Sequence, residues 1–124
     1  MAILVQTEDF DVASETKSLV AGNTNIGAVV TFTGLVRDMA GGETISAMTL
    51  EHYPEMTKTM LAKIDTQANE RWPLEASLMI HRYDRLEPGE QIILVITASA
   101  HRHAEFEAAE FLMVCLRTEA PFWE

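Results

Sequence analysis

The chain has 124 residues, the length of a single domain, and 48% of them are hydrophobic, which is enough for a core. Its net charge is −10, from 19 acidic and 9 basic residues, so we expect neither nucleic acid nor an anionic membrane as a partner. A single cysteine, Cys115, leaves no internal disulfide and favours a reducing compartment. With no signal-peptide pattern and no apolar run near the roughly 20 residues of a membrane span, we expect a cytoplasmic protein.

The first third of the chain predicts two strands around one short helix. Ile3–Val5 has the composition of a short strand, and Asp11 can cap a helix over 12–20. Gly27–Thr33 is a second strand. Residues 38–44 contain two adjacent glycines and predict a flexible loop or a hairpin connection.

The middle of the chain predicts a strand followed by a long helix. Ile45–Tyr53 alternates between two faces, which is typical of a strand. Pro54 stands where a helix start tolerates proline, and apolar residues then recur at helical spacing as far as Trp72. Pro73 ends the helix.

The last third predicts a hairpin and a final helix. Ala76–Tyr83 and Gln91–Ser99 are strands, and Pro88 and Gly89 fit the centre of a type II turn between them. The last helix should run from about His103 to Arg117, with an apolar stripe of Phe106, Ala109, Met113 and Leu116. Because one strand pair is joined by a tight turn, the pattern favours an α+β fold over a doubly wound parallel sheet.

Three basic residues, His101, Arg102 and His103, come where the last strand gives way to the last helix. Free backbone N–H groups and the helix dipole favour an anion at such a place, so these residues predict a small anion pocket in an otherwise acidic protein. Ordinary solvated charges at a helix start are the alternative. A metal site is a weaker hypothesis, since the two histidines share a face only in a strand and no third ligand is evident.

Two further arginines are candidates for the same site. Arg37 follows a predicted strand and precedes the glycine loop, where it could bind a phosphate with two parallel hydrogen bonds or simply be a solvated loop charge. Arg117 is one turn after Met113, so both could line one pocket wall, although an arginine near a helix C-terminus is also favoured by the dipole. The aromatic pair Phe122 and Trp123 should pack on the body, contact a partner or mark the point where a longer chain is cut.

Taken together, several segments resemble the large, catalytic subunits of molybdopterin synthases, the MoaE family. They appear in the family's order and spacing and extend from about Gly27 to the end of the chain. The matching segments are VTFTGLVR at 30–37, LEHYPEMT at 50–57, RWPL at 71–74, SAHR at 99–102 and APFW at 120–123.

The resemblance implies an activity, a fold and an assembly. The family transfers sulfur to cyclic pyranopterin monophosphate (precursor Z) and so makes the dithiolene of molybdopterin. The sulfur arrives as a thiocarboxylate at the C-terminus of a small ubiquitin-like subunit. The implied fold is an α/β hammerhead with an additional antiparallel sheet. The implied assembly is a heterotetramer with a central dimer of large subunits.

The resemblance also implies roles for particular residues. Arg37, His101 and Arg102 would hold the substrate phosphate and the anionic sulfur donor close together. Phe32 and Met113 would line the pocket that receives the donor tail and the substrate. Positioning, charge stabilisation and proton movement are the tasks that remain for the protein, and neither a metal nor an organic cofactor is expected.

The chain departs from the family pattern near its end. The family usually has a catalytic lysine where this chain has Arg117, and a second lysine where it has Glu124. It also extends beyond this point with a C-terminal segment that supplies further pocket residues, so we expect residues 1–124 to form a single domain without that segment. Two alternatives to the active enzyme therefore stay open. The chain could be a catalytically impaired scaffold that docks the small subunit, or a module that binds small anions.

Overall fold

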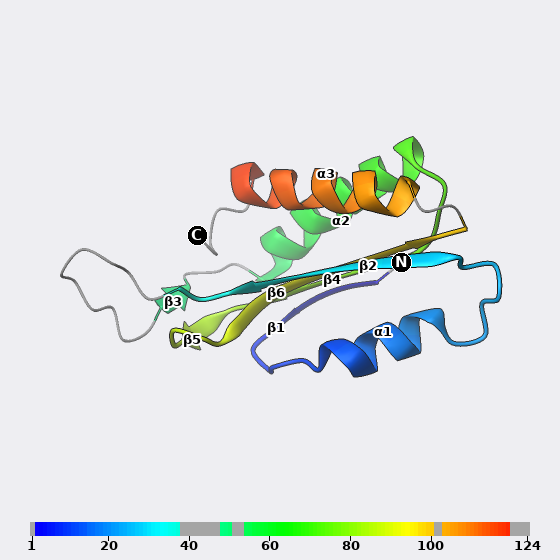
Figure 1. The fold of residues 1–124 in the computed structure, drawn as a ribbon. Helices are drawn as coiled ribbons and strands as arrows, with labels where there is room; N and C mark the ends of the chain where they lie inside the picture. Colours follow the sequence, from blue (N-terminus) through cyan, green and yellow to red (C-terminus); the bar gives the residue numbers. More distant parts are fainter. Residues whose placement is uncertain (1, 38–47, 51–53, 101–102, 120–124) are drawn as a thin grey trace.

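The computed structural model describes residues 2–37, 48–50, 54–100 and 103–119. Three helices and six strands follow one another along the chain in these ranges (Figure 1). Their bounds are β1 Ala2–Gln6, α1 Val12–Val20, β2 Ala28–Leu35, β3 Met48–Leu50, α2 Pro54–Arg71, β4 Leu74–Arg82, β5 Asp84–Leu86, β6 Gln91–Ser99 and α3 Ala104–Glu119.

The main sheet has the strand order β1-β4-β6-β2. Strand β1 runs parallel to β4, whereas β6 runs antiparallel to both of its neighbours, β4 and β2. Helix α1 covers one face of this sheet, and α2 and α3 cover the other (Figure 1). Strands β3 and β5 form a second, small antiparallel sheet. The predicted α+β class is confirmed, with the hammerhead-like sheet and the additional antiparallel sheet.

Two local predictions are confirmed in atomic detail. Asp11 caps α1, because its side chain accepts a hydrogen bond from the Ser14 N–H at 3.1 Å. The turn at Pro88 and Gly89 is closed by the Glu90 N–H, which donates to the Glu87 carbonyl at 3.0 Å. Gly89 has a φ of 93°, the left-handed value that the third residue of a type II turn requires.

The small sheet differs from what the sequence predicts. Within the predicted strand 45–53 the structure describes only β3, and the other residues lie outside the described part. The predicted hairpin between β4 and β6 exists, but β5 lies in its connection and pairs with β3. A strand of three residues carries too little periodicity to be recognised from sequence.

The predicted apolar stripe of α3 is partly wrong. Phe106 is 63% exposed, whereas Ala109 is buried as expected. The residues that face inward in the described part of the helix are mostly small: Ala104, Glu105, Ala108, Ala109 and Leu112. Alanines let the helix lie close to the sheet, and this close packing determines the buried face more than the hydrophobicity of Phe106 does.

The core lies on both sides of the two central strands, β4 and β6. On the side of α2 and α3, Met79 and Val95 pack with Leu61 and Leu112. On the side of α1, the core cluster is formed by Phe10, Leu78, Ile80, Leu94 and Ile96. Both central strands therefore bury apolar side chains on both faces of the sheet. This is why their sequences do not alternate between apolar and polar residues. No helix in the described part combines the length and the apolar character needed to cross a membrane.

A glycine fixes the approach of the chain to the end of β6. The Gly27 N–H donates to the Ser99 carbonyl at 2.9 Å. A Cβ atom on Gly27 would lie 2.5 Å from the Ala100 carbonyl oxygen, well inside contact distance. The position therefore requires glycine for the close approach of two backbones.

We predict that Gly27→Ala lowers the free energy of unfolding by about 1–3 kcal/mol, because the backbone at Ala100 must move to admit a methyl group. Urea denaturation measures the change. Thr24→Ala, an exposed change in the same loop, is the control and should stay within about 0.5 kcal/mol of the parent chain. Equal stability of the two variants would contradict the close contact.

Candidate functional site

The pairing of β2 with β6 decides which predicted site residues can meet. Ala28 pairs with Ser99 at one end of the ladder, and Leu35 pairs with Gln91 at the other. Arg37 follows the Leu35 end, whereas the chain toward His101 leaves from the Ser99 end. An eight-residue strand spans roughly 25 Å, so the sheet separates Arg37 from the start of the β6–α3 connection by about its own length.

Helix α3 extends over the same distance, from one end of the sheet to the other. It begins beside the Ser99 end and runs back toward the end at which β2 leads to Arg37 (Figure 1). Its 16 residues span roughly 24 Å, so Arg117, in its last turn, lies far from its start. The backbone thus brings Arg117 toward the end that carries Arg37. The Arg117 side chain lies outside the described part.

His101 and Arg102 themselves lie outside the described residues, but the residues on both sides of them are well anchored. Ser99 Oγ donates to the Pro73 carbonyl at 3.1 Å. Thr97 Oγ1 donates to the carbonyl of Glu105, in the first turn of α3, at 2.7 Å. Together with the Gly27 contact, these bonds fix where the chain leaves β6 and where it enters α3.

Arg37 extends from a firmly held strand end. The preceding residue, Val36, is buried, and its N–H donates to the Glu90 carbonyl at 2.9 Å. The Val36 carbonyl accepts a hydrogen bond from the Gly89 N–H at 2.7 Å. The side chain of Arg37 is exposed, so a fixed backbone presents a cation to solvent, as a binding arginine requires.

The two predicted wall residues lie on neighbouring elements. Phe32 is half-buried on β2, and Met113 is half-buried in the second half of α3. Strand β2 and α3 are in contact along this side of the molecule. The structure therefore places Phe32, Met113, Arg37 and the Arg117 backbone on one side, and the flanks of 101–102 at the opposite end.

Sequence reasoning missed a line of buried polar residues between the main sheet and the helices α2 and α3, which consists of Asp65, Ser77, Thr97 and Glu105. Asp65 of α2 is 1% exposed and accepts a hydrogen bond from Ser77 Oγ at 3.0 Å. Ser77 is paired across the sheet with Thr97, which holds the Glu105 carbonyl. Burial raises the pKa of the Asp65 carboxyl, and the Ser77 hydrogen bond opposes this effect.

Glu105 is the second acid of this line. Its side chain is fully buried, and neither carboxylate oxygen has a hydrogen-bond partner in the described part. A glutamate in the first turn of a helix normally predicts a solvated residue that favours the dipole, so its sequence gives no signal of burial. The described residues contain no cluster of three or more histidine, cysteine, aspartate or glutamate side chains that could hold a metal ion.

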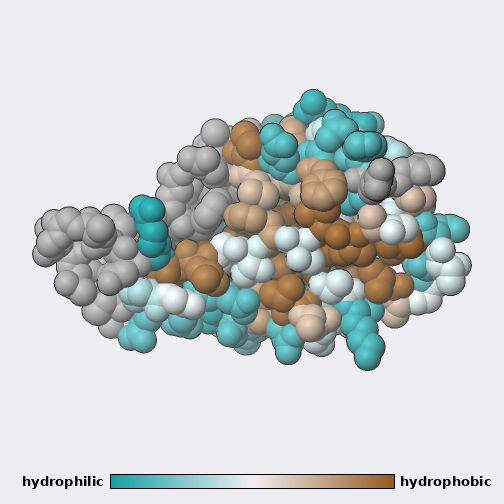
Figure 2. Space-filling view, in the orientation of Figure 1, coloured by the Kyte–Doolittle hydropathy of each residue, from teal (hydrophilic) through white to brown (hydrophobic). Residues whose placement is uncertain are grey.

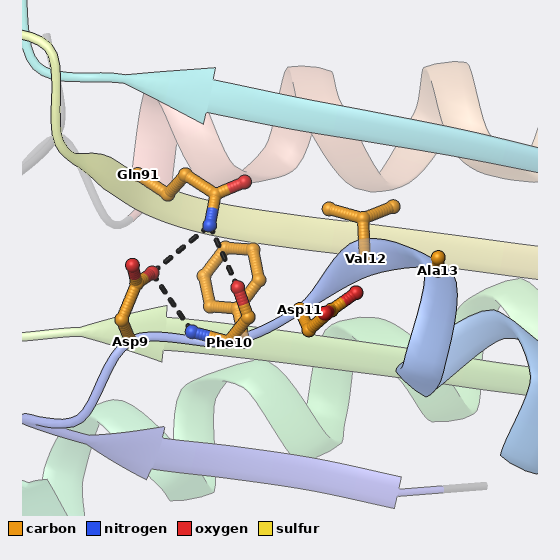
Figure 3. A pocket seen from close by; sticks show the side chains of 6 residues that line it. All are labelled: Asp9, Phe10, Asp11, Val12, Ala13 and Gln91. Atoms are coloured by element: carbon orange, nitrogen blue, oxygen red, sulfur yellow. Dashed lines mark hydrogen bonds between the residues drawn. The ribbon is translucent and has the colours of Figure 1, made fainter.

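A surface hollow at the start of α1 has the wrong charge for an anion (Figure 3). Asp9 accepts hydrogen bonds there from Gln91 Nε2 at 2.9 Å and from the Phe10 N–H at 2.8 Å. The Gln91 bond, assisted by Phe10 and by the charge of Arg82, holds the pKa of Asp9 below its usual range. This hollow therefore carries the carboxylates of Asp9 and Asp11, and its hydrogen bonds join the segment before α1 to Gln91 of β6.

Comparison with known proteins gives a consistent result. The family model described as MoaE protein matches residues 5–119. The molybdopterin synthase catalytic subunit of Mesorhizobium japonicum is 50% identical over 98% of this chain and 76% of its own length. That of Pseudomonas aeruginosa is 52% identical over 100% of this chain and 83% of its own. The molybdopterin biosynthesis MoaE protein of Burkholderia ambifaria superposes with a TM-score of 0.85 at 44% identity, over 94% of this chain and 77% of that one.

The buried carboxyl of Asp65 predicts that the stability of the chain depends on pH. Because burial raises the pKa of Asp65, the folded chain binds this proton more tightly than the unfolded chain does. The stabilisation is present below the ordinary value of 3.8 and is lost as pH rises through the higher folded value. Asp65→Asn has no such proton, so its stability relative to the parent chain should increase between about pH 4 and pH 7.

Urea denaturation at a series of pH values measures this difference. Gln67→Ala, an exposed change in the same helix, is the control, since it alters no titratable group and should give a difference that does not vary with pH. A pH-independent difference for Asp65→Asn would show that the buried carboxyl is ionised equally in the folded and unfolded chains.

Proposed function

The chain belongs to the MoaE family, and from this membership we propose that it is the large subunit of a molybdopterin synthase. In this proposal it transfers sulfur from a C-terminal thiocarboxylate on a small ubiquitin-like subunit to precursor Z. The product is the dithiolene of molybdopterin.

The observation that carries the proposal is the extent of the family match. It covers residues 5–119 and so includes every residue assigned to the site: Phe32, Arg37, His101, Arg102, Met113 and Arg117. Relatives at 50–52% identity over nearly the whole chain are named molybdopterin synthase catalytic subunits, and at that similarity the backbone that holds the site is shared.

The chemistry of the reaction fits the cations of this chain. The substrate carries a cyclic phosphate, and the sulfur donor is an anion, so the two repel each other. Arginine at 37 and 102 would pair with their oxygens and offset this repulsion. His101 can hold or release a proton near neutral pH, and Arg117 supplies a further positive charge.

The arrangement of the sheet supports a site that is built from two copies of the chain. Within one chain, Arg37 and the end of α3 that carries Arg117 are about a sheet length from the connection that carries His101 and Arg102. We therefore propose that the central dimer joins two half-sites. One consists of Arg37 and Arg117, and the other consists of His101 and Arg102 of the partner subunit.

Arg117 favours a second candidate function. Arginine at 117 keeps a positive charge but cannot readily release a proton at neutral pH. If the reaction requires an amine there, the chain is a scaffold that docks the small subunit and keeps the dimer without turnover. Glu124, in place of a second cation, favours the same alternative.

Reconstitution tests the proposed function. The chain is mixed with a thiocarboxylated small subunit and precursor Z, and molybdopterin is assayed as its fluorescent oxidised derivative. We predict product, and we predict that Arg102→Ala lowers kcat/KM by about 100-fold or more, because an anion contact is lost. Lys63→Ala, an exposed change on α2, is the control and should leave turnover unchanged. Absence of product while the complex still forms would favour the scaffold.

Arg117→Lys separates charge from proton transfer. If proton transfer by an amine is the missing role, kcat should rise by about 100-fold in the variant. The dependence of kcat on pH is the accompanying measurement, since a titrating lysine adds an ionisation that arginine cannot. An unchanged rate and pH profile would show that the charge and shape of arginine are sufficient.

A further inference from the structure

Burial alone does not fix the end of β2 from which Arg37 extends. Leu35 is 51% exposed, and Figure 2 shows apolar residues at the surface along the main sheet. Arg37 is exposed as well, and only Val36 between them is buried. The two backbone hydrogen bonds between Val36 and the turn before β6, residues 87–90, therefore fix the chain here.

A bulge in the ladder between β2 and β6 lies at the same place. Gly34 pairs with Ile93, whereas the next residue, Leu35, pairs with Gln91, so β6 has one residue more than β2 there. A bulge of this kind bends the strand and changes the direction of the residues that follow. The direction in which β2 leads to Arg37 thus depends on how firmly Gln91 and the turn before it are held.

The side chain of Arg82, on β4, holds the backbone at Gln91. It is 8% exposed, and its Nη1 donates to the Gln91 carbonyl at 2.8 Å. Its Nε and Nη2 donate to the carbonyl of Thr7, in the segment after β1, at 3.1 and 3.0 Å. A planar guanidinium makes these bonds together because its donors point in fixed directions. Arg82 therefore ties the start of β6 to the segment between β1 and α1.

The contacts of Arg82 with carbonyl groups outweigh its ion pairs. Its Nη1 lies 3.5 Å from Asp9 Oδ1 and 3.4 Å from Glu90 Oε1. The Asp9 and Glu90 side chains are 62% and 40% exposed, and water weakens ion pairs with such groups. The bonds to the two carbonyl groups are shorter, so the shape of the guanidinium matters here more than its charge does.

Glu90 closes the turn before β6 with both its side chain and its backbone. Its Oε2 accepts a hydrogen bond from the Glu87 N–H at 2.8 Å, and its own N–H donates to the Glu87 carbonyl at 3.0 Å. The Glu90 carbonyl accepts from the Val36 N–H at 2.9 Å. The residue that closes the turn is therefore the one that receives the hydrogen bond from the end of β2.

We propose that Arg82 and Glu90 are positioning residues for Arg37. This inference rests on the proposed function, in which Arg37 binds an anion of the reaction. Arg82 fixes the start of β6, and Glu90 closes the turn before it. The closed turn then fixes Val36, the residue next to Arg37. A cation held on a fixed backbone loses less conformational freedom when it binds its anion, so binding is tighter and better oriented.

Amide hydrogen exchange tests the positioning without turnover. Glu90→Ala removes the carboxylate that closes the turn, so exchange at the Val36 and Gly89 amides should rise by about 10-fold more than at Leu94 in the core. Glu87→Ala is the matched control, because it removes the same charge from the same turn and its side chain makes no hydrogen bond in the part that the structure describes. Equal exchange rates in the two variants would overturn the proposal.

Arg82→Lys tests the second positioning residue. Lysine keeps the positive charge, but its single ammonium lacks the fork that reaches both the Thr7 and the Gln91 carbonyls. We expect exchange at the Val36 amide to rise by about 10-fold in this variant as well. Exchange as slow as in the parent chain would show that Arg82 does not hold the turn.

A double-mutant cycle separates positioning from a general effect on the structure. Glu90→Ala should lower kcat/KM for precursor Z by about 10-fold in the parent chain but by less than about 2-fold in Arg37→Ala, which has no guanidinium left to position. Glu87→Ala should leave kcat/KM unchanged in both backgrounds. A general loss of structure would lower kcat/KM by the same factor with and without Arg37, and that result would overturn the proposal.

The two measurements distinguish failure of this inference from failure of the proposed function. If Glu90→Ala speeds exchange at Val36 and the parent chain forms no molybdopterin, the positioning of the backbone at Arg37 stands and the proposed function fails. If the parent chain forms molybdopterin and Glu90→Ala changes neither the exchange nor kcat/KM, the positioning is wrong and the proposed function stands.

Discussion

The ladder between β2 and β6 is the constraint on which the other features of this chain depend. It pairs Ala28 with Ser99 and Leu35 with Gln91, so the segments that lead to Arg37 and to residues 101–102 leave from opposite ends of one sheet. Gly27 holds the Ser99 end by a contact that only glycine allows, and the Pro88–Gly89 turn holds the other end through Val36. Arg37 therefore extends from a fixed backbone at one end, and the chain leaves β6 from a fixed point at the other.

Helix α3 follows from the same constraint. It must return along the sheet from the Ser99 end, and its alanines let it lie close to β6 and β2 while Phe106 is left in solvent. The acids Asp65 of α2 and Glu105 of α3 are buried, and the Asp65 carboxyl stabilises the fold less as pH rises.

The sequence predicted most of what depends on local chemistry. Asp11 as a cap, Gly89 in its turn and Pro73 after α2 each act through their own backbone geometry, so a single residue is enough to recognise them. Prediction from the sequence failed where tertiary packing decides burial or pairing. These places are exposed Phe106, buried Glu105 and the three-residue strand β5. The site residues came from motifs, but no motif shows that Arg37 and Ser99 lie at opposite ends, because register is set by pairing between distant segments.

The most direct measurement is complementation between two defective chains. Arg37→Ala and Arg102→Ala are each expressed alone and then together, and sulfur transfer to precursor Z is assayed. If the site is shared between copies, mixed dimers contain one intact site, and co-expression should restore about one quarter of the parent activity. If both arginines act within one chain, every chain carries a lesion, and activity no higher than that of the single variants would contradict this account.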